Sequence, residues 1–268
     1  MLQPIRLVVT DMDGTLLDEN RQLPADFALR VQQLEARGIA WAIASGRQYD
    51  NLAEVFSAAG VYPDIIAENG ALAFAAHETE PFFCDLTPAS FFRPILEAAL
   101  TVPRATPVLC GVHCAWVADS YPENFEAVSH YFSKTERWHA LSEIASLQVC
   151  KVAVYHPEAA AVLWPVLAPL CRPDLAVIRS SPYWIDVQPM RINKGRALAA
   201  LLCRFSLAPE QVVVFGDYLN DLEMMTLGTH SVAMGNAHPE LAAHCAHRAL
   251  SNRENGVMRY LEDLGLFA

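Results

Sequence analysis

Two apolar runs that each end in acidic residues are the feature that most constrains the fold of this 268-residue chain. Residues 5–9 read Ile-Arg-Leu-Val-Val and lead into Asp11 and Asp13. Residues 211–215 read Gln-Val-Val-Val-Phe and lead into Asp217. Short apolar runs of this kind are typical of strands in a parallel sheet, where ligands bind beyond the carboxyl ends of the strands. The pattern predicts a sheet that gathers carboxylates at one edge.

The first acidic segment reads Asp11-Met12-Asp13-Gly14-Thr15 and has two interpretations. An Asp-Gly turn that closes a strand explains it without any chemistry. Alternatively, residues two apart in a strand face the same side, so that both carboxylates point at one place. Two close carboxylates repel each other unless a cation or a shared proton compensates, which is unfavourable for folding and useful for catalysis. The second acidic segment favours the catalytic interpretation.

The second acidic segment, Gly-Asp-Tyr-Leu-Asn-Asp at residues 216–221, has the same design. Asp217 follows its strand as Asp11 follows the first one, and Asp221 comes one helical turn later, on the side that points back towards the strand end. Three converging carboxylates need a hard divalent cation. Oxygen ligands without His or Cys favour magnesium over zinc or copper, so Mg²⁺ is the expected cofactor.

Two further segments supply hydrogen-bond donors and positive charge. Ser45 and Gly46 follow the apolar run 39–44 at a helix start, where free backbone N–H groups bind anions, although Ser45 alone could be an ordinary N-cap. Lys194 opens another helix, where a cation is mildly unfavourable with the helix dipole, so we expect an anion beside it. A solvated surface lysine is the alternative. The predicted apolar stripe of this helix is Ala197, Leu198, Leu201, Leu202 and Phe205.

The four motifs occur in the order Asp-x-Asp-Gly-Thr, Ser-Gly, Lys-Gly and Gly-Asp-x-x-Asn-Asp. In this order, the chain resembles the haloacid dehalogenase (HAD) superfamily, in its Cof-type phosphatase branch. The resemblance covers the whole chain, and the matching segments are 11–17, 44–47, 68–71, 193–195, 216–221 and 232–237. Residues 67–72 and 110–117 most resemble bacterial members that hydrolyse sugar phosphates.

The alternation of strands and helices at both ends of the chain predicts the α/β class with a parallel sheet. The resemblance implies a three-layer Rossmann-like HAD core at 1–83 and 188–268, with an inserted α+β cap domain at 84–187 that sets substrate specificity. The core strands are expected at 4–10, 39–44, 64–67, 211–215 and 231–234, with a hairpin segment at 71–75. The core helices are expected at 24–37, with Phe27, Val31 and Leu34 facing inward, and at 48–59, 194–206, 219–227, 239–244 and 256–264.

The insert changes character from the core. Its expected strands are 106–111, 113–118, 148–155, 175–179 and 183–188, and its expected helices are 88–100, 122–133 and 157–170. Pro165 and Pro169 lie inside the last of these helices, which is therefore expected to be short or kinked.

The resemblance implies hydrolysis of a phosphate monoester through an aspartyl-phosphate. Asp11 would attack phosphorus, and Asp13 would protonate the leaving oxygen and later deprotonate the attacking water. Magnesium would be held by Asp11, the Asp13 backbone carbonyl and Asp217, with Asp221 acting through a water. The expected phosphate contacts are the side chains of Ser45, Lys194 and Asn220 and the backbone N–H groups of Met12 and Gly46.

Arg47 and Asn69 lie next to this site by motif position, and each is expected either to contact substrate or to support the residues that do. His113 is a further candidate for a contact with substrate. His113 is either a neutral donor to a hydroxyl or a buried structural histidine. Together with Cys110 and Cys114 it could suggest zinc, but no second ligand pair follows at zinc spacing, and core and cleft residues in a strand are the better interpretation. Arg191 stands where the family often has a glycine-containing turn, and is either solvated or a second anion contact.

Substrate and function stay open at this point. The insert carries few charges and several aromatic residues, which favour a sugar or polyol phosphate as substrate. The aromatic residues are Trp116, Tyr121, Tyr183 and Trp184. Pyridoxal phosphate and nucleotides are alternative substrates. A sugar phosphomutase or other phosphotransferase would share both aspartates, whereas a non-catalytic sensor of phosphorylated metabolites has no need of them.

Composition limits the classes of molecule that this chain is expected to bind. A formal net charge of −11 argues against nucleic acid and anionic membranes, so the expected partner is a small phosphorylated metabolite. Seven scattered cysteines fit reduced thiols, no signal peptide is indicated, and the longest uncharged run, 105–118, is too short to span a membrane. We expect a cytoplasmic monomer or small homo-oligomer.

Overall fold

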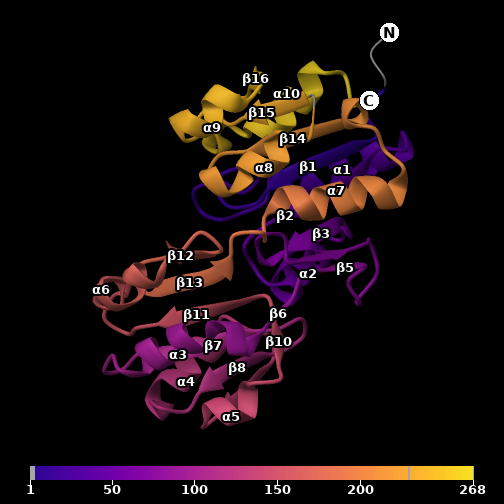
Figure 1. Ribbon diagram of the computed structural model, residues 1–268. Coiled ribbons are helices and arrows are strands. Elements are labelled where there is room, and N and C mark those ends of the chain that lie inside the picture. The colour runs from indigo at the N-terminus through magenta and orange to yellow at the C-terminus, as the bar shows by residue number, and fades with distance from the viewer. Residues whose placement is uncertain (1–3, 229, 268) are drawn as a thin grey trace. The chain divides into compact units, whose positions relative to one another are not determined.

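The computed structural model describes residues 4–228 and 230–267, which group into two compact units. Unit 1 combines the described residues up to Cys84 with those from Asn193 onward, and unit 2 is Asp85–Ile192 (Figure 1). Each unit has its own sheet and its own buried core. The chain therefore leaves unit 1 once and returns to it directly before Lys194.

Unit 1 contains an eight-stranded sheet in the order β16-β15-β14-β1-β2-β3-β4-β5. The six strands from β16 to β3 are parallel, and β4 and β5 are antiparallel to their neighbours. The strands are β1 (Leu7–Asp11), β2 (Ala40–Ala44), β3 (Asp64–Ala67), β4 (Leu72–Phe74), β5 (Phe83–Cys84), β14 (Val212–Gly216), β15 (His230–Ala233) and β16 (His247–Arg248). From β1 the chain proceeds to β2 on one side, while β14 lies on the other, so the strand order reverses at β1. Ligands bind at such a reversal in open α/β sheets.

Helices cover both faces of this sheet and confirm the predicted α/β class. They are α1 (Phe27–Ala36), α2 (Tyr49–Ala58), α7 (Lys194–Phe205), α8 (Leu222–Met225), α9 (Pro239–His244) and α10 (Gly256–Asp263). Apolar side chains of α7, α8 and α9 form one core with β1, β2 and β14. On the other face, Phe27 of α1 packs against Trp41 of β2 and Phe56 of α2, and Phe215 of β14 packs against Tyr260 of α10.

The helix faces of unit 1 follow the predicted stripes with one exception. Phe27, Val31 and Leu34 are the buried residues of α1, as expected. The prediction for Phe205 of α7 is wrong, because its side chain is 41% exposed. Phe205 is the last residue of the helix, which ends at Ser206, a residue in the left-handed conformation with a φ of +53°. Short 3-10 turns complete the unit at Glu68–Gly70, Pro209–Gln211, Leu219–Asp221 and Asn252–Glu254.

Unit 2 contains a six-stranded sheet in the order β12-β13-β11-β7-β8-β9 and a two-stranded pair of β6 and β10. Its strands are β6 (Thr87–Pro88), β7 (Thr106–Cys110), β8 (Ala115–Ala118), β9 (Thr135–Trp138), β10 (Gln148–Val149), β11 (Lys151–Tyr155), β12 (Leu175–Arg179) and β13 (Trp184–Pro189). Its helices are α3 (Arg93–Leu100), α4 (Phe125–Ser129), α5 (Leu141–Ile144) and α6 (Trp164–Leu167), with 3-10 turns at Ala89–Phe92, Pro122–Asn124, Ala160–Val162 and Ala168–Leu170.

Several elements of unit 2 differ from the predictions. The expected helix 122–133 is reduced to a 3-10 turn and the five residues of α4. The expected strand 148–155 is interrupted at Cys150. The expected helix 157–170 is broken into short pieces around Pro165 and Pro169, which lack the N–H that a continuous helix needs, in line with the prediction.

Two of the aromatic and charged residues singled out in the sequence have structural partners within unit 2. Trp184 is buried and packs against the rings of Tyr155 and Phe132, so it belongs to the core of the unit. Arg191 donates from Nε to Asp85 Oδ1 at 2.9 Å and from Nη2 to Thr87 Oγ1 at 2.7 Å. It thereby joins the first and the last segments of unit 2 and is more than a solvated residue.

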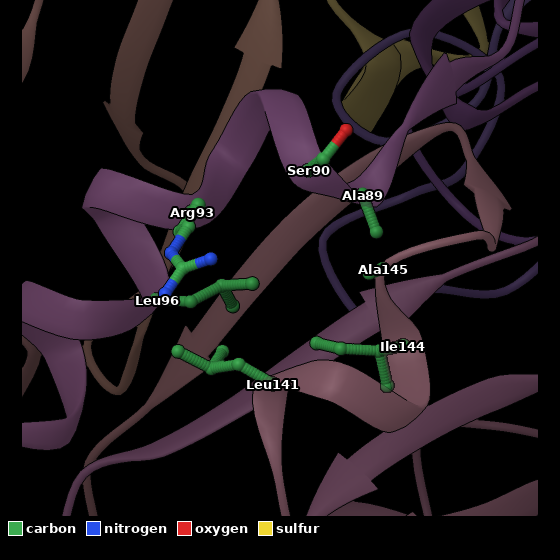
Figure 2. Close-up of a pocket in the computed structure, with 7 residues that line it drawn as sticks. All are labelled: Ala89, Ser90, Arg93, Leu96, Leu141, Ile144 and Ala145. Carbon is green, nitrogen blue, oxygen red and sulfur yellow. The ribbon is translucent and has the colours of Figure 1, made fainter.

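The two hollows found in unit 2 lack carboxylates and are poor candidates for an active site. Figure 2 shows Leu96 of α3 facing Leu141 and Ile144 of α5 around a cavity of about 30 Å³, which has room for roughly one water. A larger hollow of about 210 Å³ is lined by Ala161, Trp164, Pro165 and Arg179. Among the described residues, no helix is both long and apolar enough to cross a membrane.

Candidate active site

The predicted site residues of unit 1 gather at the carboxyl ends of its parallel strands. Asp11 is the last residue of β1, Ser45 follows β2 and Asp217 follows β14. Lys194 is the first residue of α7, which packs on the face formed by β1, β2 and β14. The site therefore lies where the strand order reverses, as expected for an open α/β sheet.

Lys194 is at the centre of the site. Its side chain is 0% exposed, which excludes the alternative of a solvated surface lysine. Nζ donates to Asp11 Oδ1 and to Asp221 Oδ1, both at 2.6 Å. The helix start that carries Lys194 is capped by Asn193, whose Oδ1 accepts from the Arg196 backbone N–H at 2.9 Å. The anion predicted beside this lysine is thus a pair of carboxylates.

Burial and mutual attraction set the charges of this group. Burial alone lowers the pKa of Lys194, but the attraction of Asp11 and Asp221 outweighs it and leaves that pKa raised. Burial raises the pKa of Asp11 well above its usual value; Lys194 opposes this effect, and the neighbouring Asp221 adds to it. Lys194 is therefore held as a cation, and Asp11 lies in a place where further positive charge is favourable.

Three carboxylates converge beside the lysine. Asp11, Asp217 and Asp221 each offer an oxygen, and these oxygens lie within 4.8 Å of one another. Asp217 Oδ1 accepts from Thr15 Oγ1 at 2.9 Å, and burial raises the pKa of Asp217 to about 6. Asp221 Oδ2 accepts the backbone N–H groups of Asp217 and Tyr218 at 3.0 and 3.2 Å. Three carboxylates share one ammonium, and this donor set of oxygens fits a hard divalent cation such as Mg²⁺.

Two glycines make this convergence possible. Gly14 has a φ of +88°, and a Cβ at this position would lie 2.4 Å from Asp217 Oδ2. A Cβ on Gly216 would lie 2.7 Å from Asp221 Oδ2. Both distances are far below van der Waals contact, so only glycine lets the two loops approach the carboxylates.

Asp13 lies outside the carboxylate cluster and is bound to Arg47. Arg47 Nε donates to Asp13 Oδ2 at 2.8 Å, and Nη2 donates to Oδ1 at 2.5 Å. The Asp13 side chain is 48% exposed. The two carboxylates predicted from one strand end thus have separate surroundings, one buried beside Lys194 and one half-exposed beside Arg47.

The expected phosphate-binding residues also come together. Ser45 is buried, and its backbone carbonyl accepts the Asn69 N–H at 3.0 Å. The Asn69 side chain lies against Gly46, where an added Cβ would be 3.0 Å from Asn69 Oδ1. Asn220 Nδ2 donates to the same Asn69 oxygen at 3.3 Å. The Met12 side chain is fully buried, which leaves only its backbone for the expected contact.

Two asparagines of the site had no role in the sequence-based predictions. Asn236 Nδ2 donates to the Gly14 carbonyl at 2.8 Å, and Asn252 Nδ2 donates to the Leu17 carbonyl at 2.8 Å. Asn252 N–H donates to Asn236 Oδ1 at 3.0 Å and links the two. They hold the loop that follows Asp13. The signal available in the sequence was the Met-Gly-Asn-Ala motif directly after β15.

The structure contradicts one of the two interpretations of His113. It is exposed in the turn between β7 and β8 of unit 2, because β8 begins only at Ala115, so the interpretation as a buried structural histidine is wrong. Cys110 and Cys114 are buried as expected of core residues. Within the part of the chain that the structure describes, the only cluster of three or more metal-binding side chains is that of Asp11, Asp217 and Asp221.

Comparison with known protein families shows to which family the chain belongs. The family model described as haloacid dehalogenase-like hydrolase matches residues 8–261. The chain belongs to this family. The predicted family and the predicted class, a phosphoric monoester hydrolase, are both confirmed by the match and by the phosphatases among the relatives of this hydrolase.

The curated relatives cover most of the chain. The 5-amino-6-(5-phospho-D-ribitylamino)uracil phosphatase YbjI of Escherichia coli is 26% identical over 96% of this hydrolase and 95% of its own length. The HMP-PP phosphatase of Cronobacter sakazakii is 27% identical over 90% of this hydrolase and 88% of its own length.

Solved structures agree on the fold of this hydrolase. TM0651 from Thermotoga maritima matches with a TM-score of 0.81 and 25% identity, and covers 97% of both chains. A haloacid dehalogenase-like hydrolase from Bacteroides thetaiotaomicron matches with a TM-score of 0.80 and 24% identity, over 97% of this chain and 99% of its own; this likeness shows the fold alone.

Proposed function

We propose that this hydrolase is a magnesium-dependent phosphatase of small phosphorylated metabolites, with sugar or polyol phosphates as its substrates. The observation that carries the proposal is the surroundings of Asp11: a buried carboxylate at a strand end, hydrogen-bonded to a buried lysine and beside two more carboxylates. In the proposed reaction an aspartyl-phosphate forms on Asp11 and is then hydrolysed by water.

In the first step Asp11 attacks phosphorus while Lys194 holds its Oδ1. The transition state of phosphoryl transfer is loose, and its charge spreads over the three equatorial oxygens. Ser45, the backbone N–H groups of Gly46 and Met12, and Lys194 are the proposed donors to those oxygens, with Asn220 beside them. Their convergence at one edge of the sheet supports this assignment.

Asp13 is the proposed general acid and base. It protonates the leaving oxygen in the first step and takes a proton from water in the second. Its position supports this role, because it is half-exposed and separate from the buried cluster of Asp11, Asp217 and Asp221. Asp13 is neither the nucleophile nor a partner of Lys194, and it exchanges protons with the leaving group and with water through an oxygen that leaves Arg47.

The cation would be held by the Asp11 carboxylate, the Asp13 backbone carbonyl and Asp217. When bound, Mg²⁺ supplies the positive charge that lets a carboxylate approach a phosphate dianion. Asp221 would act through a water. This indirect role is supported by its contacts, since one oxygen is bound by Lys194 and the other by two backbone N–H groups.

Residues 84–187, which correspond closely to unit 2, are proposed to act as the cap that selects the leaving group, with His113 as a candidate donor to a hydroxyl. The name of the Escherichia coli relative describes a phosphorylated ribityl chain carried by a uracil. This supports a polyol phosphate as substrate and favours, as a second candidate, a polyol phosphate that carries a heterocycle.

The test is a panel of phosphorylated metabolites with phosphate release as the readout, in the presence of MgCl₂ or of EDTA. The panel contains hexose phosphates, ribitol 5-phosphate, pyridoxal phosphate and nucleotides. Magnesium-dependent turnover that is highest with hexose or polyol phosphates is expected. Highest turnover with nucleotides would overturn the substrate class. Exchange stimulated by a bisphosphorylated sugar would identify a phosphomutase, and tight binding without turnover would identify a sensor.

A further inference from the structure

The contact between Arg47 and Asp13 has the geometry of a positioning device. The planar guanidinium binds both carboxylate oxygens at once, from Nε at 2.8 Å and from Nη2 at 2.5 Å. A bidentate contact of this kind fixes the plane of the carboxylate as well as its position, which a single hydrogen bond or a lysine does not. The two residues are 34 positions apart and come from different loops, so the contact is made by the fold.

Arg47 is the anchored partner of the two. Its backbone N–H donates to Ser45 Oγ at 3.2 Å, and its backbone carbonyl accepts the Glu68 N–H at 3.0 Å. Its Nη1 donates to Asn51 Oδ1 on α2 at 3.4 Å. The Arg47 side chain is 27% exposed, compared with 48% for Asp13. A residue tied at its backbone and at its guanidinium orients the more exposed carboxylate.

We propose that Arg47 is a positioning residue that sets the orientation of the Asp13 carboxylate for proton transfer, an inference that rests on the proposed phosphatase function. In the first step the bond from Asp11 to phosphorus forms, the ester P–O bond breaks, and the proton passes from Asp13 to the leaving oxygen. Arg47 neither gains nor loses a proton. Asp13 enters this step protonated on the oxygen that has left Arg47, gives that proton to the leaving oxygen and becomes a carboxylate, while the hydrogen bond from Arg47 to its other oxygen keeps the group in place.

This role differs in its consequences from direct contact with substrate, which is the other role that the sequence allowed for Arg47. A residue that acts only through Asp13 contributes nothing once Asp13 is replaced. It also matters most for leaving groups that need a proton. A residue that binds the phosphate group contributes with or without Asp13, and to every substrate that carries a phosphate.

A double-mutant cycle separates the two roles. Wild type, Arg47→Met, Asp13→Asn and the double variant are compared by the single-turnover rate of leaving-group release from a hexose phosphate and from 4-nitrophenyl phosphate. We expect Arg47→Met to lower the hexose phosphate rate by about 30-fold and the aryl phosphate rate by less than about threefold, because the aryl leaving group departs without a proton. The double variant should match Asp13→Asn within about twofold.

Two further variants test whether the charge of Arg47 is sufficient and whether any loss of arginine lowers the rates. Arg47→Lys keeps the charge but loses the bidentate contact, so it should recover only part of the loss; full recovery would show that charge alone matters and would overturn the proposal. Arg30→Met removes an arginine of α1 that binds Asp26 at 2.8 Å, and should leave both rates unchanged. Thermal unfolding of each variant identifies losses that come from misfolding.

Three results would contradict the inference, and they do so in two different ways. Losses that multiply in the double variant, or that are equal for both substrates, would show that Arg47 binds substrate and would leave the phosphatase function standing. Failure of wild type to release phosphate from any substrate of the panel would overturn the proposed function, and the inference with it.

Discussion

Asp11 and Lys194 form a buried ion pair, in which burial of either charge alone would be unfavourable. Both side chains are buried, and removing one partner of a buried ion pair leaves an uncompensated charge. Asp221 changes this balance, because it also accepts from Lys194 at 2.6 Å. The lysine therefore keeps a carboxylate partner when Asp11 is altered, so function and stability at this residue can be tested separately.

We predict that Asp11→Asn folds and loses its activity. An amide is not a nucleophile toward phosphorus and is a poor ligand for Mg²⁺, so turnover should fall by at least about 10³-fold. The measurement is phosphate release, with unfolding in urea to show that the variant is folded. Asp26→Asn, a carboxylate of unit 1 that binds Arg30 on the surface, is the matched control. Near wild-type turnover of Asp11→Asn would disprove the nucleophile assignment.

Asp64 gives a prediction about stability that is independent of the site. It is the first residue of β3, 4% exposed, and its Oδ1 accepts the Ala76 N–H at 2.9 Å. Burial raises its pKa to about 6 from 3.8, against smaller lowering effects of Ala76 and Arg204. A raised pKa means that the folded state binds the proton more tightly than the unfolded chain. The contribution to stability is therefore present below pH 4 and is lost as the pH rises to about 6.

Asp64→Asn should consequently gain stability over wild type at neutral pH. The amide keeps an acceptor for the Ala76 N–H and carries no charge, which removes a cost of about 2–3 kcal/mol that wild type bears at pH 7.5. The free energy of unfolding in urea is compared at pH 7.5 and at pH 4.5. The advantage of the variant should be larger at pH 7.5, and an equal difference at both values would refute the assignment to Asp64. Asp217, whose pKa is also about 6, is present in both proteins and cancels in the difference.

At the scale of elements, the turn between β3 and β4 connects two parts of the site. Glu68, Asn69 and Gly70 have φ values of +51°, +54° and +96°, a run of left-handed conformations that is costly outside glycine. The turn aims Asn69 at Gly46 and Asn220. It also lets Gly70 lie directly against the start of α7, where a Cβ would be 2.2 Å from the Asn193 carbonyl oxygen. Strain in this turn is therefore coupled to the position of Lys194.

Gly70→Ala should reduce activity by displacing the start of α7. The added methyl group must push away backbone atoms of Asn193 and Lys194, and a shift of about 1 Å in a catalytic group can lower the rate by about 10²-fold. Gly60→Ala is a matched control, because Gly60 has a φ of +72° but no atom within 4 Å of an added Cβ. Both variants should lose stability, measured by thermal unfolding, and only Gly70→Ala should lose turnover. Equal turnover of the two variants would argue against coupling through the turn.

The elements also show what the sequence could predict. The strands at 64–67 and 175–179 were predicted with the bounds that the structure shows, because apolar β-branched residues between turn residues are a local signal. β9 was missed, since Thr-Glu-Arg-Trp is a short charged segment whose pairing with β8 depends on the rest of the sheet. The helix expected at 122–133 ends after Ser129 for the same reason, as the chain leaves it to form β9.

The site likewise contains residues whose position could be predicted from the sequence and contacts that could not. Its carboxylates, Ser45 and Lys194 follow strands or open helices, so their position at one edge of the sheet could be predicted from spacing. The pairing of Asp13 with Arg47 could not, because it depends on how two loops are offset from each other in space. The ties from Asn236 and Asn252 to the loop after Asp13 are likewise contacts across more than 200 residues.

At the scale of the whole molecule, the chain re-enters unit 1 directly beside the site. Unit 2 begins after Cys84 and ends at Ile192, and the next two residues are Asn193, which caps α7, and Lys194. The residue that neutralises Asp11 and Asp221 is thus joined directly to the inserted unit. The completed site still has three carboxylates for one ammonium, so the folded protein should be more stable with a divalent cation than without one.

We therefore predict that Mg²⁺ raises the thermal stability of the whole protein. A ligand that binds only the folded state at 100 times its Kd adds about 2.7 kcal/mol, which corresponds to an increase in Tm of roughly 5–10 °C for a chain of this size. Asp217→Asn should lose most of this increase, whereas Asp26→Asn should retain it. Because the pKa of Asp217 is about 6, protons compete with the cation at low pH, and the increase should be smaller at pH 5 than at pH 7.5. The measurement is thermal unfolding in MgCl₂ and in EDTA, and it needs no substrate. An equal increase in wild type and Asp217→Asn would show that the cation binds elsewhere.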